Sequence, residues 1–217
     1  MPEILKVSQE TGTRRGVLIL IFGPMFSGKT GELIDRVDSE SHVGQYGIIV
    51  KPSNDIRYEV DKVVTHSGRK IDAYRVDKGN PQEIINLIAE QESKGGCIDI
   101  IGIDEAQFFE KFSLIKAIEK LINNGKTVMV AGLPTDYRDE PYGAIPELIA
   151  KADLTIQRTT ARCTHKFEDG SYCKEIATKT QRFTDGEPSR YDEEVDIVGG
   201  KELYEARCRR HHEVRRD

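Results

Sequence analysis

Apolar residues occur along the chain in two patterns, short continuous runs and stripes with helical spacing. The run Val17–Phe22 holds six apolar residues, several of them β-branched, and predicts a buried strand. After a glycine turn, Leu33, Ile34 and Val37 fall on one side of a predicted helix. The chain therefore begins its folded part with a strand, a turn and an amphipathic helix.

The same two patterns alternate through the next hundred residues. Further strands are predicted at Gly47–Lys51, Cys97–Ile103 and Thr127–Ala131, the last of them after an Asn-Gly turn. Helices are predicted from Pro81 to Lys94 and over Phe112–Ile122. Strands that alternate with helices indicate an α/β fold, a parallel sheet with helices on both faces.

Two stretches do not follow this alternation. Pro52–Arg69 is polar and contains a Thr-His-Ser-Gly turn, which indicates a mobile loop beside the active site. Residues 159–217 hold three of the four cysteines and show no helical stripe. We therefore predict two domains, an α/β domain over 1–158 and a small polar domain over 159–217 that needs support beyond apolar burial.

The turn after the first strand carries a phosphate-loop pattern. Gly23, Gly28, Lys29 and Thr30 have the spacing G-x-x-x-x-G-K-[ST]. Backbone N–H groups of such a turn point at phosphate oxygens, and the following helix adds its positive end. The lysine reaches the β- and γ-phosphates and the threonine hydroxyl binds Mg²⁺. A chance glycine turn does not explain the ordered strand, loop and helix, so we predict a nucleoside triphosphate site.

Two adjacent carboxylates end the strand Cys97–Ile103. Asp104 is placed like the aspartate that holds Mg²⁺ in phosphate-loop enzymes. Glu105 follows it and can take a proton from an attacking hydroxyl or, in an ATPase, from water. The pair therefore does not by itself distinguish a kinase from a hydrolase, and a helix-capping role remains open for one of the two.

Composition and charge exclude several classes of protein. The chain has 217 residues, 37% hydrophobic and 32% charged, with a formal net charge of −5, which gives no support to general nucleic-acid binding. The first 16 residues lack an apolar signal region and no apolar run is long enough for a bilayer. We expect a cytoplasmic protein without a membrane partner, whose cysteines are thiols or metal ligands.

A metal site is predicted from four residues in the C-terminal region. Cys208 and His211 form a C-x-x-H knuckle, and a predicted hairpin separates Cys163 from Cys173. Three thiolates and one imidazole complete a structural zinc site and leave no position for catalytic water. His212 or His165 as the fourth ligand, or unliganded cysteines, remain alternatives. Cys97 is interpreted as a small buried hydrophobe, and the C-terminal arginines as a solvated tail.

The chain resembles the type II thymidine kinases, which include the cytosolic enzyme of animals and most bacterial thymidine kinases. The resemblance runs from about Val17 to His212. Its markers are GPMFSGKT (23–30), DEAQFF (104–109), GLPTDYRDEPYG (132–143), ATKTQRF (177–183) and VGGKELYEARCRRH (198–211). It implies transfer of the γ-phosphoryl group of ATP to the 5′-hydroxyl of thymidine or deoxyuridine, with Mg²⁺, by a homotetramer.

The resemblance also implies roles for residues. Glu105 matches the general base. The ATP and Mg²⁺ contacts fall on Gly23, Pro24, Met25, Phe26, Ser27, Gly28, Lys29, Thr30, Asp104 and Gln107. The nucleoside contacts fall on Met25, Tyr137, Thr180, Arg182, Val195, Asp196, Ile197, Val198, Gly199 and Tyr204. The residues 195–199 form a lasso loop whose backbone grips the pyrimidine, and the zinc cluster closes its base.

Three departures and two rival functions complete the sequence picture. Pro134 stands where the family usually has Asp, the Cys163–Cys173 interval is longer than the usual C-x-x-C, and His211 replaces the more frequent fourth cysteine. One rival is another phosphate-loop ATPase that carries a zinc-ribbon module. The other is a zinc-ribbon nucleic-acid binder, which the acidic charge balance disfavours.

Overall fold

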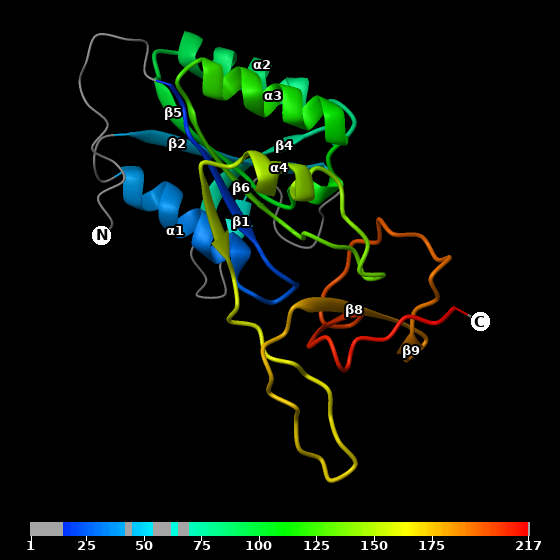
Figure 1. The fold of residues 1–217 in the computed structure, drawn as a ribbon. Coiled ribbons are helices and arrows are strands. Elements are labelled where there is room, and N and C mark those ends of the chain that lie inside the picture. Colours follow the sequence, from blue (N-terminus) through cyan, green and yellow to red (C-terminus); the bar gives the residue numbers. More distant parts are fainter. Residues whose placement is uncertain (1–14, 42–44, 54–61, 65–69, 217) are drawn as a thin grey trace.

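Two sheets organise the computed structural model, which describes residues 15–41, 45–53, 62–64 and 70–216 (Figure 1). The large sheet has the strand order β3-β4-β2-β5-β6-β1-β7, and the small sheet the order β10-β8-β9. The strands of the large sheet are β1 (Leu18–Phe22), β2 (Tyr46–Pro52), β3 (Lys62–Val64), β4 (Lys70–Val76), β5 (Ile98–Ile103), β6 (Thr127–Gly132) and β7 (Leu154–Gln157). The small sheet contains β8 (Lys179–Thr184), β9 (Glu187–Pro188) and β10 (Tyr204–Arg207).

Helices connect the strands of the large sheet. They are α1 (Lys29–Ser41), α2 (Gln82–Ser93), α3 (Lys111–Asn123) and α4 (Ile145–Lys151), with a 3-10 turn, η2 (Ala106–Phe108), directly after β5. In the described residues β4, β2, β5, β6, β1 and β7 pair in parallel, and β3 pairs antiparallel with β4. The predicted α/β fold with a parallel sheet is confirmed.

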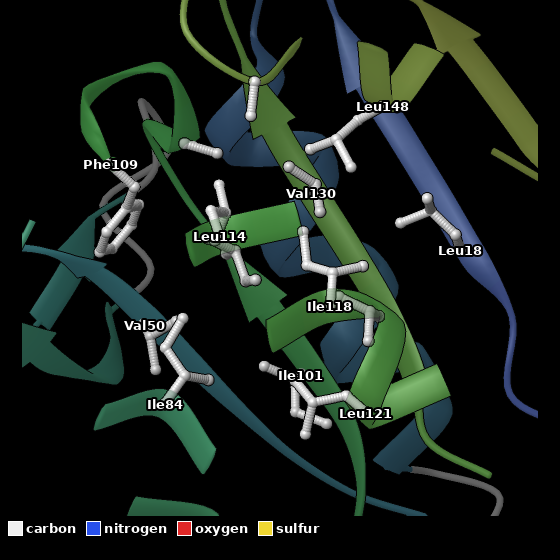
Figure 2. Close-up of a cluster of buried hydrophobic side chains, with 14 of the residues drawn as sticks. Leu18, Val50, Ile84, Ile101, Phe109, Leu114, Ile118, Leu121, Val130 and Leu148 are labelled. Carbon is white, nitrogen blue, oxygen red and sulfur yellow. The ribbon is translucent and has the colours of Figure 1, made fainter. Parts of the chain in front are cut away.

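The alternating side chains of the strands supply apolar groups to both faces of the sheet. Leu18 and Leu20 of β1 belong to the core cluster under α2, α3 and α4, whereas Ile19 and Ile21 pack with residues of α1. Figure 2 shows the first cluster, where Leu114 and Ile118 of α3 lie near Ile101 and Val130 of the sheet. Each such fully buried side chain contributes about 1.5–3 kcal/mol through the hydrophobic effect. The two clusters hold the carboxyl ends of β1 and β5 in fixed positions.

The structure also contains elements that the apolar pattern did not predict. The prediction of a loop over Pro52–Arg69 is wrong for β3, because Lys62–Val64 pairs with β4. The rest of that loop prediction, apart from Pro52 and Ser53, lies outside the described residues, as does the Thr65–Gly68 turn. The strands β4 and β7 and the helix α4 were not predicted, and the two strands extend the sheet on either side of its central strands.

The C-terminal region is built without a helix in residues 160–216. β8 and β10 pair antiparallel, and a hairpin over 162–176 projects away from the large sheet (Figure 1). The only core cluster found in this described region consists of Ala161, Ala177 and Ala206, packed against Phe26 of the phosphate loop. The domain division at residue 158 stays a prediction. No helix of the described chain is both long and apolar enough to cross a bilayer.

Candidate active site and metal cluster

The turn between β1 and α1 has the backbone form that its glycines allow. A Cβ atom on Gly23 would lie 2.7 Å from the carbonyl oxygen of Arg158, so only glycine fits there. Gly28 has φ +77°, in the left-handed region. Lys29 is buried, and its Nζ donates to the carbonyl oxygen of Pro24 at 2.8 Å. Because α1 begins at Lys29, the positive amino end of the helix lies at this loop.

The loop residues have two different environments. Met25, Phe26, Gly28, Lys29 and Thr30 line one cavity. Gly23, Pro24 and Ser27 do not line it. The fully buried Ser27 hydroxyl instead donates to the Pro24 carbonyl oxygen at 2.8 Å, which supports the curled backbone.

Asp104 lies directly after β5, beside the phosphate loop. The Thr30 hydroxyl donates to the two Asp104 carboxylate oxygens, at 3.0 and 3.1 Å. The strand β6 separates β5 from β1, so the contact spans two strand spacings at the carboxyl edge of the sheet. A hydroxyl and a carboxylate next to a phosphate-loop lysine are oxygen donors of the kind that Mg²⁺ takes, so these residues fit that ion.

Glu105 is held in an uncommon backbone conformation. Its φ is +50°, left-handed for a residue with a side chain, which costs about 1–3 kcal/mol and is typical of functional sites. The Gln107 Nε2 donates to Glu105 Oε2 at 2.6 Å, and the Leu133 N–H donates to Gln107 Oε1 at 3.1 Å. The Glu105 carboxylate therefore lines the cavity in an orientation that Gln107 fixes.

The cavity continues from the phosphate loop past Glu105 to a wall of aromatic and backbone groups. The predicted nucleoside contacts that line this end of the cavity are Tyr137, Thr180, Val195, Ile197, Val198, Gly199 and Tyr204. Additional lining residues, which sequence reasoning did not single out, include Phe108, Leu133, Asp136, Tyr142 and Gly200. All five lie inside the DEAQFF, GLPTDYRDEPYG and VGGKELYEARCRRH markers, so the motifs contained the signal. One enclosed space thus joins the phosphate loop, a carboxylate and the lasso.

Two predicted nucleoside contacts lie outside this cavity lining. Arg182 is buried, and its guanidinium stacks 3.7 Å from the ring centroid of Tyr137. It also donates to Ser189 Oγ at 3.0 Å and to Glu193 Oε2 at 2.9 Å. These bonds fix the guanidinium, which in turn packs against the Tyr137 ring and holds it in place. Burial raises the pKa of Tyr137, whose hydroxyl donates to backbone carbonyl oxygens. Asp196, the second residue, turns away from the cavity.

Residues of the C-terminal region outside the lasso are also joined to the phosphate loop. The Met25 N–H donates to Thr180 Oγ1 at 3.1 Å, and the Thr160 hydroxyl donates to the Ser27 carbonyl oxygen at 2.7 Å. These bonds connect the two sides of the cavity through residues of the loop itself.

The four predicted metal ligands converge. The ligand atoms of Cys163, Cys173, Cys208 and His211 all lie within 4.8 Å of one another. The His211 Nδ1 is 3.6 Å from Cys163 Sγ and 3.5 Å from Cys208 Sγ. Tetrahedral Zn²⁺ with ordinary bond lengths places S and N ligands about 3.6 Å apart, so the cluster fits zinc.

The pKa values of the cluster residues are shifted in different directions, and the shifts of Cys208 and His211 favour the deprotonated forms that bind zinc. Burial raises the pKa of Cys163. Burial acts in the same direction on Cys208, but backbone N–H groups of the knuckle outweigh it and lower that pKa. Desolvation and the neighbouring His165 lower the pKa of His211, which favours the neutral imidazole that binds metal.

The alternative histidines do not belong to the group of converging ligand atoms. His165 stacks on the His211 ring, with 4.0 Å between centroids, and His212 Nε2 lies 2.8 Å from the Tyr137 carbonyl oxygen. The four cluster residues therefore form the set that the geometry supports.

Sequence comparison matches this arrangement to one family. The family model for thymidine kinase matches residues 16–212, which span both the phosphate loop and the metal cluster. The chain belongs to the thymidine kinase family.

Curated relatives agree with this family over nearly the whole chain. The thymidine kinase of Coprothermobacter proteolyticus is 43% identical, over 93% of each chain. That of Deinococcus deserti is 42% identical, over 93% of this chain and 96% of its own, and that of Mycoplasma capricolum is 36% identical, over 96% and 94%. A solved structure, the genome packaging NTPase B204 from Sulfolobus turreted icosahedral virus 2 in complex with ATP-gammaS, covers 71% of this chain and 78% of its own at 17% identity, with a TM-score of 0.43. A similarity this low is not evidence for a shared fold or function.

Two further predictions, one for Cys97 and one for the C-terminal arginines, are wrong. Cys97 is exposed rather than buried, because β5 begins one residue later. The C-terminal arginines do not all form a solvated tail. Arg207 is buried beside Phe183, and the Arg215 N–H donates to the Ser189 carbonyl oxygen at 3.1 Å. The chain end therefore packs on the small sheet.

Proposed function

We propose that this enzyme transfers the γ-phosphoryl group of ATP to the 5′-hydroxyl of thymidine or deoxyuridine, forming dTMP or dUMP and ADP. The observation that carries the proposal is the single cavity that has the phosphate loop at one end, Glu105 in the middle and the lasso at the other. A donor phosphate and an acceptor hydroxyl bound at the two ends would meet beside the Glu105 carboxylate. Family membership agrees with this assignment.

The chemical step uses residues of the carboxyl edge of the sheet. Glu105 accepts the proton of the 5′-hydroxyl while the oxygen attacks the γ-phosphorus and the bond to the bridging oxygen of ADP breaks. Lys29 and the N–H groups of the loop stabilise the charge on the transferred group and on the leaving oxygen. Asp104 and Thr30 would hold Mg²⁺, which neutralises phosphate charge when bound.

Recognition of the nucleoside is assigned to the other end of the cavity. Tyr137 and Met25 supply apolar and aromatic surface for the base, and the backbone of Val195–Gly199 supplies hydrogen-bonding groups for its edge. Structural zinc at the four-residue cluster would hold the chain segments on both sides of the lasso together. In this division, residues 1–158 bind ATP and contribute Met25 and Tyr137 to the site of the base, and residues 159–217 supply the lasso that holds the nucleoside.

Assembly and location follow from the family resemblance. We place the enzyme in the cytoplasm as a homotetramer. Light scattering of the purified protein measures the oligomer directly, and a monomer at micromolar concentration would contradict it.

The decisive experiment is a phosphorylation assay across the deoxynucleosides with ATP and Mg²⁺. We expect thymidine and deoxyuridine to be phosphorylated and ADP release to depend on the nucleoside. ADP release at the same rate without any nucleoside would favour the alternative, a phosphate-loop ATPase with a zinc-ribbon module.

Replacing Lys29 tests the phosphate loop. Lys29→Ala removes a cation that meets the transferred group, so kcat/KM for ATP should fall about 10²-fold. The fold should survive, because the Lys29 Nζ contacts a loop carbonyl oxygen and no core side chain is removed. Circular dichroism controls for folding, and steady-state turnover at the parent rate would show that the loop has only a structural role.

A further inference from the structure

Two tyrosine hydroxyls hold neighbouring residues of the lasso. The Tyr142 hydroxyl donates to Asp196 Oδ1 at 2.8 Å, and the Tyr204 hydroxyl donates to the Ile197 carbonyl oxygen at 2.6 Å. Tyr142 comes from the segment between β6 and α4, and Tyr204 is the first residue of β10. The lasso is therefore fastened at adjacent positions to the α/β core and to its own sheet.

Both tyrosines belong to the cavity wall. Tyr142 and Tyr204 are buried, and both rings line the cavity. The Tyr142 ring also packs edge-on against Phe108, with 5.9 Å between ring centroids. Burial, followed by the Asp196 charge, raises the pKa of Tyr142, so its hydroxyl stays a proton donor at neutral pH. A ring so fixed gives its partner on the lasso a defined position.

Asp196 has the opposite orientation to its neighbours. Val195 and Ile197 line the cavity, and Asp196 does not. Its side chain is 43% exposed, with Oδ2 at 3.8 Å from Lys78 Nζ. An ion pair this exposed contributes little, so the contact with the buried Tyr142 hydroxyl is the stronger of the two.

We propose that Asp196 is a positioning residue whose carboxylate latches the lasso onto Tyr142 and so sets the wall that receives the nucleoside. The inference rests on the proposed function, which places thymidine in this cavity. A loop that is already fixed loses less conformational entropy when the ligand binds, so the latch raises nucleoside affinity. It does not touch the phosphate loop, so ATP affinity and the chemical step depend on it much less.

The test separates the contribution of the Tyr142 ring from that of the Tyr142 hydroxyl. Tyr142→Phe keeps the ring and removes the donor, and Asp196→Ala removes the acceptor. Each should raise KM for thymidine about 10- to 100-fold, the range for a hydrogen bond to a charged group, with kcat and KM for ATP within about threefold. The double variant should be no worse than the more affected single variant, since both remove one contact. Asp196→Asn keeps an acceptor oxygen and should recover most of the affinity.

Tyr191→Phe is the matched control. The Tyr191 hydroxyl donates to Glu140 Oε1 at 3.0 Å, another bond between the C-terminal region and the core, and Tyr191 does not line the cavity. It should leave KM for thymidine within about twofold, and Lys78→Met should stay within about threefold.

The outcomes distinguish a failure of this inference from a failure of the proposed function on which it rests. A wild-type enzyme that neither binds nor phosphorylates thymidine overturns both. A wild-type enzyme that is active while Tyr142→Phe has the wild-type KM overturns the latch alone. Equal losses in Tyr142→Phe and Tyr191→Phe, or additive losses in the double variant, also overturn it, because they indicate general loosening.

Discussion

Glu105→Gln lowers kcat by about 10²–10⁴-fold, the usual cost of removing a general base, while thymidine and ATP bind nearly as they do to the parent enzyme. The substitution keeps size and leaves an oxygen that still accepts from Gln107, so the cavity retains its shape. What is lost is the capacity to take a proton. Single-turnover kinetics measures the chemical step, and calorimetry measures the binding of both substrates.

Glu110→Gln is the control for this variant. Glu110 is exposed, and its carboxylate caps α3 by accepting from the Phe112 and Ser113 N–H groups. Its pKa is lowered by these contacts, with Ser113 contributing most, and the residue does not line the cavity. Activity should be unchanged in this control. If Glu105→Gln turns over at a comparable rate, Glu105 is not the base.

Cys208→Ser should remove the metal and disorganise the lasso. The core of the C-terminal region consists of three alanines and Phe26, so apolar burial is small, whereas a structural zinc supplies on the order of 10 kcal/mol of folding free energy. Thymidine affinity should fall far more than ATP affinity. ATP affinity should still decrease several-fold, because the Met25 N–H donates to Thr180.

Metal analysis, proteolysis and two titrations check this expectation. Cys97→Ser is the matched variant, since Cys97 is exposed and lies outside the cluster. It should keep its zinc and bind both substrates normally. Tight thymidine binding by a zinc-free Cys208→Ser protein would separate the metal from nucleoside recognition.

The elements that sequence reasoning predicted well are those whose pattern depends on local spacing. β1, the phosphate loop and α1 follow one another within a few residues, and β5 ends at the Asp-Glu pair. The C-x-x-H knuckle is equally local. Such patterns reflect the periodicity of one element against one face of the core, so one sequence suffices to recognise them.

The missed elements depend on partners far away in the chain. β4 (KIDAYRV) mixes charged and apolar residues and becomes a strand by pairing with β2 and β3. The pattern around Arg207 and Arg215 predicts a solvated tail. Nothing nearby in the sequence indicates that Arg207 packs on Phe183 or that the Arg215 N–H bonds to Ser189. Contacts of this kind are decided by tertiary packing, which overrides local propensity.

In the site, too, the sequence predicts which residues take part but not where their side chains point. Motifs placed Arg182 and Asp196 at the nucleoside, but motif position does not give side-chain direction. Arg182 lies behind Tyr137 and Asp196 faces Tyr142, so each lies one contact away from the cavity. Tyr142 itself was inside a marker and was overlooked, because an aromatic residue before a glycine also reads as ordinary core.

The hydrogen bonds that join Leu133, directly after β6, to Glu105 through Gln107 have a fixed direction. The Leu133 N–H can only donate, so the Gln107 carbonyl oxygen must face it and the amide nitrogen must face Glu105. If the amide were turned over, donor would meet donor and acceptor would meet acceptor at the two ends. A main-chain group that directly follows β6 thus determines which kind of atom the carboxylate after β5 contacts. One backbone N–H group at the edge of the sheet therefore sets the hydrogen-bonding polarity that the Glu105 carboxylate meets.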